Sequence, residues 1–255
     1  MKRLKLFIVA CVVFCMTAAA ANAHMLWLTP ENNNPKPGQP LTVIIGFGHH
    51  FAPDEVMKKA DRMEQVYALA PDGAKIDLKA VNASTYTFTP QVNGPYVIYA
   101  SMKSGCMSTT IEGRKMGNRK TLENVVSCFG FQMAAMTTVT CGPVSDVKYE
   151  QNALTVEVIP RKNPDQVKVG DHLPMLVLYQ GKPLADATLS AVGSNCKLAK
   201  EQSWDQEVKT DADGVAIVKI TAGGPWLFSV RHKIPYSDPE TCDDMMYNTA
   251  LTLAF

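Results

Sequence analysis

Residues 25–47 read MLWLTPENNNPKPGQPLTVIIGF, two short apolar runs on either side of a connection rich in Asn, Pro and Gly. Alternating apolar runs of this length are typical of half-buried β-strands, and the Pro and Gly residues favour a turn between them. The same pattern continues through most of the chain and predicts an all-β protein of the β-sandwich class. The predicted strands are Met25–Thr29, Leu41–Phe47, Gln65–Ala70, Thr85–Thr89, Tyr96–Met102, Leu154–Ile159, Leu173–Tyr179, Thr188–Val192, Val215–Ile220, Trp226–Arg231 and Thr249–Phe255.

The strand pattern breaks once, over residues 105–142, a stretch with four methionines and three cysteines. We interpret it as an irregular insertion with one short helix. The strands on either side of it predict two immunoglobulin-like or prealbumin-like sandwich domains, residues 24–148 with the insertion and residues 149–255. A single large sandwich is the alternative, because turn residues before aromatic strands recur in β-proteins without duplication.

The first 23 residues have the pattern of a signal peptide, with basic residues, then the apolar run Leu6–Met16, then the cleavage motif Ala21-Asn22-Ala23. No later apolar run reaches the roughly 20 residues that span a bilayer. We therefore expect a periplasmic mature chain that does not insert into the membrane. The chain has 25 Lys and Arg against 24 Asp and Glu, and three of the basic residues lie in the signal peptide. A slightly acidic mature chain argues against a nucleic-acid partner.

Five cysteines follow the predicted cleavage site, enough for two disulfides and one free thiol in an oxidising compartment. Spacing does not determine which cysteines pair, although Cys128–Cys141 and Cys196–Cys242 would close short loops. The chain contains no C-x-x-C pair, which disfavours a cysteine zinc site. The five are Cys106, Cys128, Cys141, Cys196 and Cys242.

Cleavage after Ala23 makes His24 the first residue of the mature chain. Its α-amine, with an ordinary pKa near 8, and its imidazole, with one near 6.5, can both be neutral near pH 7. Together they can close one chelate ring on a transition metal. The sequence therefore predicts a metal ligand at His24, against the alternative that histidine stands there by chance.

His49 and His50 follow the second predicted strand, between Gly46-Phe47-Gly48 and Phe51. If the first two strands pair antiparallel with residue numbers summing to about 70, His24 lies opposite Gly46 and near the histidine pair. Glycines there would leave room for a metal. Neighbouring residues on a strand point to opposite faces, so one of the two histidines is expected to join His24. The alternatives are a polar strand exit without metal, or a Cu⁺ site among the methionines of residues 102–136.

Six motifs carry a resemblance over essentially the whole mature chain. They are HMLWLTP at 24–30, GHHF at 48–51, GKPL at 181–184, TDADG at 210–214, GPWL at 224–227 and LTL at 251–253. The chain resembles a family of exported β-sandwich proteins classed as a domain of unknown function and associated with nickel and cobalt uptake, as the periplasmic component. The resemblance implies metal ligands at His24, His50 and His232, with His49 as the alternative to His50. From its position alone His232 is expected to be a surface histidine, and His172 a turn residue.

These observations predict a periplasmic, non-enzymatic protein that binds a divalent transition metal and delivers it to a membrane transporter. Ni²⁺ is the first choice and Co²⁺ or Cu²⁺ the alternatives, since nitrogen donors suit all three. The predicted ligands are His24, His49 or His50, and His232. A copper carrier, a β-sandwich adhesion or interaction module without metal, and a copper oxidase with an N-terminal histidine brace are the other hypotheses.

Overall fold

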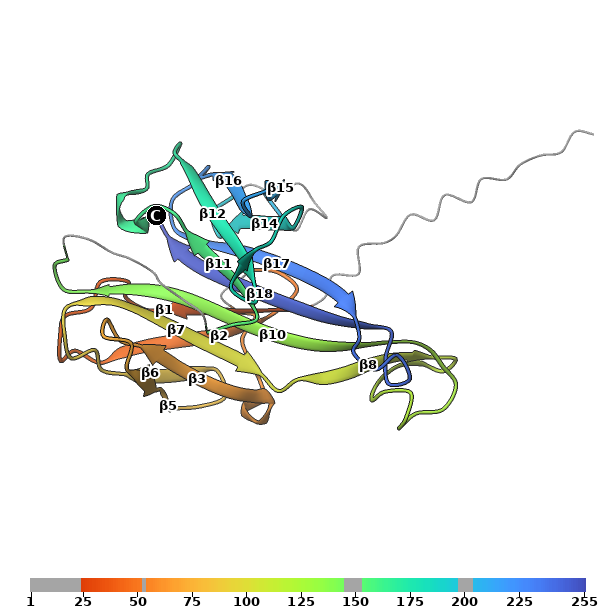
Figure 1. Cartoon of the computed structure of the whole chain (residues 1–255). Coiled ribbons are helices and arrows are strands. Elements are labelled where there is room, and N and C mark those ends of the chain that lie inside the picture. Colours follow the sequence, from red (N-terminus) through yellow and green to blue (C-terminus); the bar gives the residue numbers. More distant parts are fainter. Residues whose placement is uncertain (1–23, 52–53, 145–152, 197–203) are drawn as a thin grey trace, which may run out of the picture.

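The computed structural model describes residues 24–51, 54–144, 153–196 and 204–255 (Figure 1). These residues form strands and two short 3-10 turns, Ala60–Arg62 and Pro164–Gln166, and contain no α-helix. The all-β prediction is confirmed, and every predicted strand overlaps an observed one. The signal-peptide prediction and the predicted boundary at 148/149 lie outside the described residues. No helix in the described part of the chain is long and apolar enough to cross a membrane.

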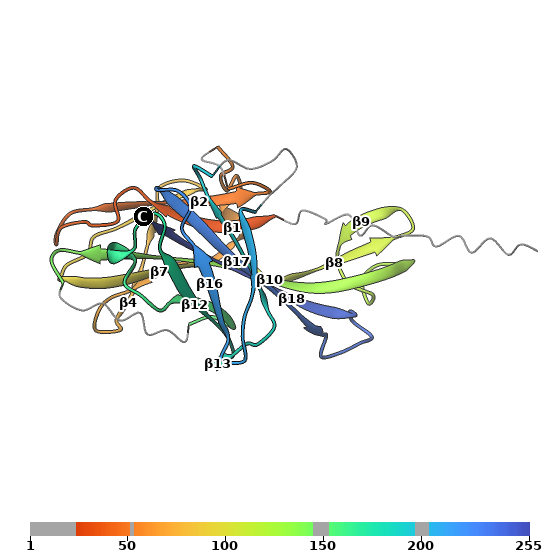
Figure 2. The same ribbon diagram turned by 90° about the horizontal axis from the view of Figure 1, so that it is seen from above.

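A long sheet runs through the middle of the molecule, in the order β15-β14-β17-β18-β10-β7-β3-β4, with β8 and β9 extending it beside β10 (Figure 2). Its strands come from both halves of the chain, which meet where β10 pairs with β18 in parallel. The strands are β3 (Met63–Leu69), β4 (Lys75–Asp77), β7 (Gly94–Met102), β8 (Gly105–Thr110), β9 (Gly113–Met116), β10 (Val125–Cys141), β14 (Thr188–Gly193), β15 (Gln206–Lys209), β17 (Pro225–Pro235) and β18 (Asp244–Ala254).

Two smaller sheets cover opposite faces of this central sheet. Sheet A has the order β1-β2-β6-β5, and sheet C consists of β11, β12, β13 and β16. Side chains alternate across the pleat, so Ala135 of β10 lies in a core with sheet A, whereas Met136 lies in a core with sheet C. The strands are β1 (Met25–Pro30), β2 (Leu41–Gly48), β5 (Lys79–Ala80), β6 (Thr85–Phe88), β11 (Val156–Pro160), β12 (His172–Tyr179), β13 (Lys182–Pro183) and β16 (Val215–Lys219).

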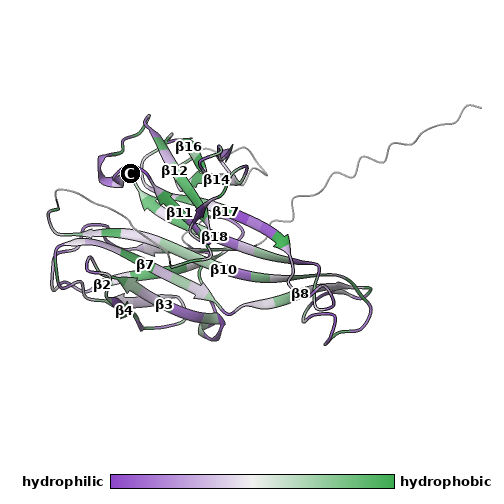
Figure 3. Cartoon of the chain, viewed as in Figure 1, coloured by the Kyte–Doolittle hydropathy of each residue, from purple (hydrophilic) through white to green (hydrophobic). Residues whose placement is uncertain are grey.

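The two cores consist of different apolar residues and lie on the two faces of the central sheet. Figure 3 shows apolar segments concentrated in the strands of the body, with hydrophilic segments at the loops and along the outer part of β17. Trp226 and Phe228 of β17 are fully buried in the core with sheet C. Leu26 and Ile45 are buried in the core with sheet A. Each histidine of the predicted site therefore lies on one face or the other of the central sheet.

The prediction of an irregular insertion at residues 105–142 is wrong. Three strands, β8 to β10, occupy the segment, and no described residue of it is helical. In β10, residues 134–141 are all buried, because sheets cover the strand on both faces. A strand buried on both sides shows no alternation of apolar and polar residues, which is why the strand pattern missed it.

The disulfide joins Cys128 to Cys242, which is neither of the two short-loop pairs. The Cα atoms of this pair are 4.7 Å apart, although 114 positions separate them in the chain. The parallel pairing of β10 with β18 begins with Phe129 opposite Asp244, so Cys128 of β10 meets Cys242 in the turn before β18. Cys106, Cys141 and Cys196 are free thiols. Loop length was a poor guide because the decisive contact is made between the two halves of the chain.

Candidate metal centre

His24 and His49 face each other at the open end of the β1–β2 hairpin. Met25 pairs with Gly48, so His24 and His49 are the next opposed positions beyond the last pair. The Nδ1 atom of His24 lies 3.1 Å from the Nε2 atom of His49, and the ring centroids are 4.0 Å apart. Without metal, one of these nitrogens donates its proton to the other. The structure thus brings the predicted first residue of the mature chain to one member of the histidine pair.

The predicted strand register is wrong by three positions. Paired residue numbers sum to 73, so Trp27 and not His24 lies opposite Gly46. The hairpin turns within Pro35-Lys36-Pro37-Gly38, where the Gln39 N–H donates to the Lys36 carbonyl at 3.0 Å and Gly38 has a φ of 77°. That turn lies inside the ten-residue connection 31–40, and the Glu31 N–H donates to the Thr42 carbonyl at 3.0 Å, which continues the register with a sum of 73 beyond the last strand pair. The corrected register selects His49 over His50 as the partner of His24.

The glycines before the histidine pair accommodate protein side chains, contrary to the expectation that they leave room for a metal. A Cβ atom on Gly46 would overlap the indole of Trp27, and one on Gly48 would overlap the carboxylate of Glu55. Glu55 Oε2 also accepts the backbone N–H of His50 at 3.0 Å. Both glycines therefore hold the loop after β2 in the conformation that presents His49 to His24.

The surroundings of His24 favour its neutral imidazole. Its ring stacks on Phe47, with centroids 4.7 Å apart and planes 12° from parallel, and the Arg62 guanidinium lies over the same Phe47 ring at 5.7 Å. Burial lowers the pKa of His24, with a further lowering from His49, while the Glu55 carboxylate opposes both. A lowered pKa keeps the imidazole neutral near pH 7, and the neutral form is the one that binds metals.

The spacing of the two imidazole nitrogens fits coordination of one ion. Metal–nitrogen bonds of about 2.0–2.1 Å at angles between about 90° and 110° place the two nitrogens roughly 2.9–3.4 Å apart. The observed separation of 3.1 Å lies inside that interval. Among the described residues, no third His, Cys, Asp or Glu ligand atom lies within 4.8 Å of both. Further donors would have to come from the His24 main chain, from solvent or from a partner.

The other predicted ligands are not brought to this pair. His232 pairs with Tyr247, and its ring packs 4.6 Å from Tyr179, on the face that carries the core with sheet C. Burial there lowers the pKa of His232. The His24 carbonyl accepts from Asn248 Nδ2 at 3.4 Å, and Asn248 alternates with Tyr247, so His24 lies on the opposite face. The central sheet therefore separates His232 from His24.

His50 and His172 also lie apart from the pair. His50 is exposed, and its described contact to Glu55 is made through the backbone. His172 begins β12 opposite Lys219, so it is a strand residue and not the expected turn residue, and its carbonyl accepts from Lys162 Nζ at 3.0 Å. The methionines of the competing hypothesis lie in different places: Met136 is in the core with sheet C, Met133 packs against the core with sheet A, and Met107 and Met116 are opposed in the β8–β9 ladder.

Sequence reasoning missed three residues that shape the pair: Phe47, Glu55 and Arg62. The Glu55 carboxylate packs on Gly48 and accepts the backbone N–H of His50. The available signal was an acidic residue placed within six positions of Gly48-His49-His50. Arg62 left no such signal, because it reaches Phe47 from the 3-10 turn before β3.

A family model described as a domain of unknown function, DUF4198, matches residues 21–234. The chain belongs to this family. The match to the DUF4198 family spans His24, His49 and all of β1 to β16. None of the curated protein sequences matches the chain.

Solved structures similar to this DUF4198 protein are β-rich and distant. The D0-D1 domain of intimin has a TM-score of 0.23 and 11% identity, with 91% of this chain and 100% of that chain covered. The Yersinia pseudotuberculosis adhesin InvE has a TM-score of 0.24 and 11% identity, with 91% and 58% covered. Fibronectin(III)-like modules of Clostridium thermocellum CbhA have a TM-score of 0.20 and 10% identity, with 88% and 93% covered.

Proposed function

We propose that this protein is an exported carrier that binds one divalent transition-metal ion at its mature N-terminus and delivers it to a membrane transporter. The observation that carries the proposal is the 3.1 Å separation between His24 Nδ1 and His49 Nε2, directly after a predicted cleavage site. Cleavage after Ala23 would add the α-amine of His24 as a third nitrogen. The ligand set is then the amine and Nδ1 of His24 with Nε2 of His49.

This ligand set suits a carrier because it leaves the ion accessible. His24 is exposed and His49 half-buried, so two or three coordination positions would face solvent or a docking partner. A transporter could supply its own ligands at those positions before the carrier releases the ion. All three donors belong to one hairpin, so release requires no separation of sheets. His232 is not needed for this site.

We propose Ni²⁺ or Co²⁺ as the cargo because of the resemblance to components of nickel and cobalt uptake. The donor set alone does not choose, since nitrogen ligands bind all late divalent ions of the first row and bind Cu²⁺ most tightly. A copper carrier is therefore the second candidate, and the three nitrogen donors support it. The two hypotheses differ in cargo and share the site.

The ligand assignment is tested by metal titration of the mature protein with Ni²⁺, Co²⁺ and Cu²⁺ in a chelator-competition assay. His49→Ala should lower the affinity for every ion by at least about tenfold, as expected for loss of a ligand. His172→Ala is the matched control and should bind as the parent does. Equal affinity of His49→Ala and His172→Ala would contradict the site.

The cargo is tested by metal accumulation in cells that lack the gene, grown with limiting Ni²⁺, Co²⁺ or Cu²⁺. A nickel or cobalt carrier predicts reduced accumulation of that ion, restored by the parent gene and not by the His49→Ala gene. A defect confined to copper would replace the nickel and cobalt hypothesis with the copper one. Normal accumulation of all three would contradict delivery.

A further inference from the structure

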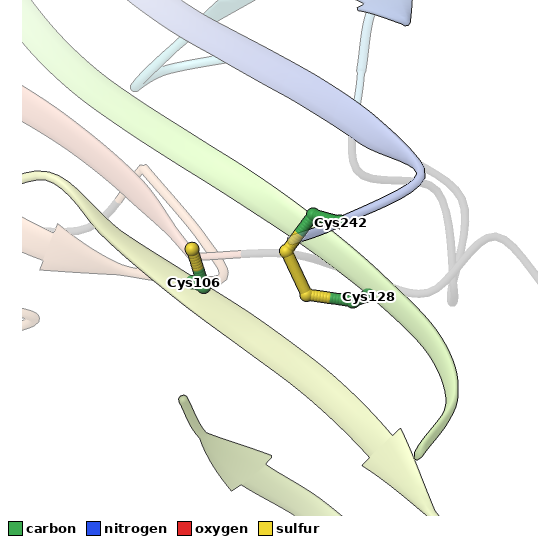
Figure 4. Close-up of side chains that lie close together, drawn as sticks. All are labelled: Cys106, Cys128 and Cys242. Atoms are coloured by element: carbon green, nitrogen blue, oxygen red, sulfur yellow. A yellow bond between two sulfur atoms is a disulfide. The ribbon is translucent and has the colours of Figure 1, made fainter. Parts of the chain in front are cut away.

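A second cluster of metal-binding side chains lies at the base of the β8–β9–β10 extension. The Sγ atoms of Cys106, Cys128 and Cys242 all lie within 4.8 Å of one another (Figure 4). Cys128 and Cys242 form the disulfide, and Cys106 is a free, half-buried thiol beside it. The disulfide accounts for two of the three sulfur atoms, and the Cys106 thiol is the third.

The strand registers bring the three sulfurs together. Cys106 pairs with Gly130 and Cys128 with Ser108 in the β8–β10 ladder, so Cys106 and Cys128 are diagonal neighbours on the same face. Cys242 reaches them from the turn before β18, where the Asp243 N–H donates to the Cys128 carbonyl at 2.9 Å. The Cys128 N–H donates to Asp243 Oδ2 at 2.8 Å. These two hydrogen bonds connect β10 to the turn that carries Cys242.

Arg119 also stabilises this connection between β10 and the turn before β18. Its Nη2 atom donates to both carboxylate oxygens of Asp243 at 2.8 Å, and these bonds lower the pKa of that carboxyl. The backbone around Cys128 and Cys242 is therefore held by contacts besides the disulfide, so the two sulfurs should stay close after reduction.

Sulfur and a phenol cover the remaining side. A Cβ atom on Gly130 would overlap the Tyr236 ring and would stand 2.9 Å from Met245 Sδ, so both side chains fill the space across from Cys106. The Tyr236 hydroxyl lies within hydrogen-bonding reach of the Cys106 sulfur and can donate its proton to it. The surroundings of the three cysteines thus combine a thioether with a hydroxyl donor.

We propose that Cys106, Cys128 and Cys242 form a redox-gated site for Cu⁺, distinct from the histidine site. Three sulfurs at about 2.3 Å from one ion in a plane lie roughly 4.0 Å apart, so Cys128 and Cys242 need only separate to that distance on reduction, and all three sulfurs already lie within 4.8 Å. Soft thiolates select Cu⁺, which accepts three ligands. Structural zinc takes four, and the described residues offer no fourth His, Cys, Asp or Glu at this spacing.

The disulfide excludes the ion, so the site opens by reduction. A dithiol transfers two electrons and two protons to the Cys128–Cys242 bond, which becomes two thiols while the dithiol becomes a disulfide. Cu⁺ then displaces one proton from each of the three thiols. Exchange with a disulfide re-forms the Cys128–Cys242 bond: the incoming disulfide takes up the two electrons and two protons from solvent and becomes a dithiol, two ligands are lost, Cys106 regains its proton and the ion is released. The oxidised protein keeps only Cys106, and one thiol does not hold Cu⁺ against competing chelators.

The two sites can be tested separately because the central sheet lies between them. Cys106 and Cys128 share the face of Gly130 and Met245, opposite the face on which sheet A carries His24. His24 contacts Asn248, whose partner on β10 is Met133, five residues after Cys128. At about 3.4 Å per residue, the offset along β10 is roughly 17 Å.

The experiment uses the mature protein with His24→Ala and His49→Ala, titrated anaerobically with Cu⁺ against a coloured chelator. The phosphine-reduced protein should bind one Cu⁺ per chain, and the oxidised protein should bind at least about tenfold more weakly. Cys106→Ser should weaken binding by the reduced protein by at least about tenfold, and Cys196→Ser should leave it unchanged. Equal binding by oxidised and reduced protein, or equal binding by the two serine variants, would overturn the proposal.

A second measurement covers variants that fold poorly. Alkylation of the reduced protein, followed by mass spectrometry, should show Cys106, Cys128 and Cys242 protected by Cu⁺ while Cys196 reacts freely. Circular dichroism before and after reduction reports whether the strands persist. Unprotected Cys106 in folded, Cu⁺-loaded protein would overturn the site, whatever the histidine variants show.

Discussion

The β1–β2 hairpin and the β8–β10 extension each gather metal-binding side chains, and they do so by contacts of different range. In the hairpin, a ten-residue connection sets the register, and His24 meets His49 across 25 positions. In the extension, Cys242 meets Cys128 only because β18 pairs in parallel with β10. A local turn thus builds one site, and the joining of the two halves of the chain builds the other.

The largest expected effect is on the free energy of unfolding, and it distinguishes the two sites. Replacing Cys128 and Cys242 together with serine removes a crosslink over 114 positions and should lower the free energy of unfolding by about 4–5 kcal/mol. Nickel affinity at the hairpin should not change. Urea denaturation under oxidising conditions, with Cys196→Ser as control, measures the first, and calorimetry measures the second. A loss of nickel affinity would show that the hairpin depends on the extension.

The second effect is the pH response of the hairpin site. An α-amine with an ordinary pKa near 8 becomes more fully protonated as pH falls. The affinity for metal should therefore drop at least about a hundredfold between pH 7.5 and 5.5. The lowered pKa of His24 adds little above pH 6.5, because that imidazole is already neutral there. Calorimetric titration at both pH values checks this. A flat profile would mean that no α-amine binds the metal.

The third effect tests whether the hairpin register holds the site. Gly46→Ala forces a Cβ atom against the Trp27 ring and should lower the free energy of unfolding by about 1–3 kcal/mol, with weaker nickel binding. Gly223→Ala is the matched control, since a Cβ there meets its nearest atom, the Phe255 carbonyl oxygen, at 3.5 Å. If both variants behaved alike in thermal unfolding, the Trp27 contact would not fix the register.

The smallest effect is expected from a variant that removes one metal donor and leaves the fold intact. One extra alanine before His24 should lower nickel affinity by about tenfold, or about 1.4 kcal/mol, because the amine is moved away from the imidazole. The melting temperature without metal should stay the same, since the addition is at a terminus. N-terminal sequencing must confirm the extension. Unchanged affinity would leave His24 as an imidazole ligand only.

Sequence reasoning succeeded where contacts are local. The alternating runs identified the strands of the hairpin, and the need for one histidine beside His24 followed from strand geometry. It missed the register by three positions because a connection of ten residues does not fix by itself which residues of the two strands lie opposite each other. The observed register selects His49. The location of His232 was out of reach, because it depends on which face of a shared sheet β17 presents.

The sequence by itself determined the all-β class, the antiparallel hairpin and the chemistry of a histidine at a predicted mature N-terminus. Tertiary structure decided that Cys128 pairs with Cys242, that Cys106 joins them, and that the central sheet separates His232 from His24. The physical reason is that strand periodicity and turn chemistry are encoded within a few residues. The pairing of β10 with β18 is chosen by burial of two whole cores, which no local pattern records.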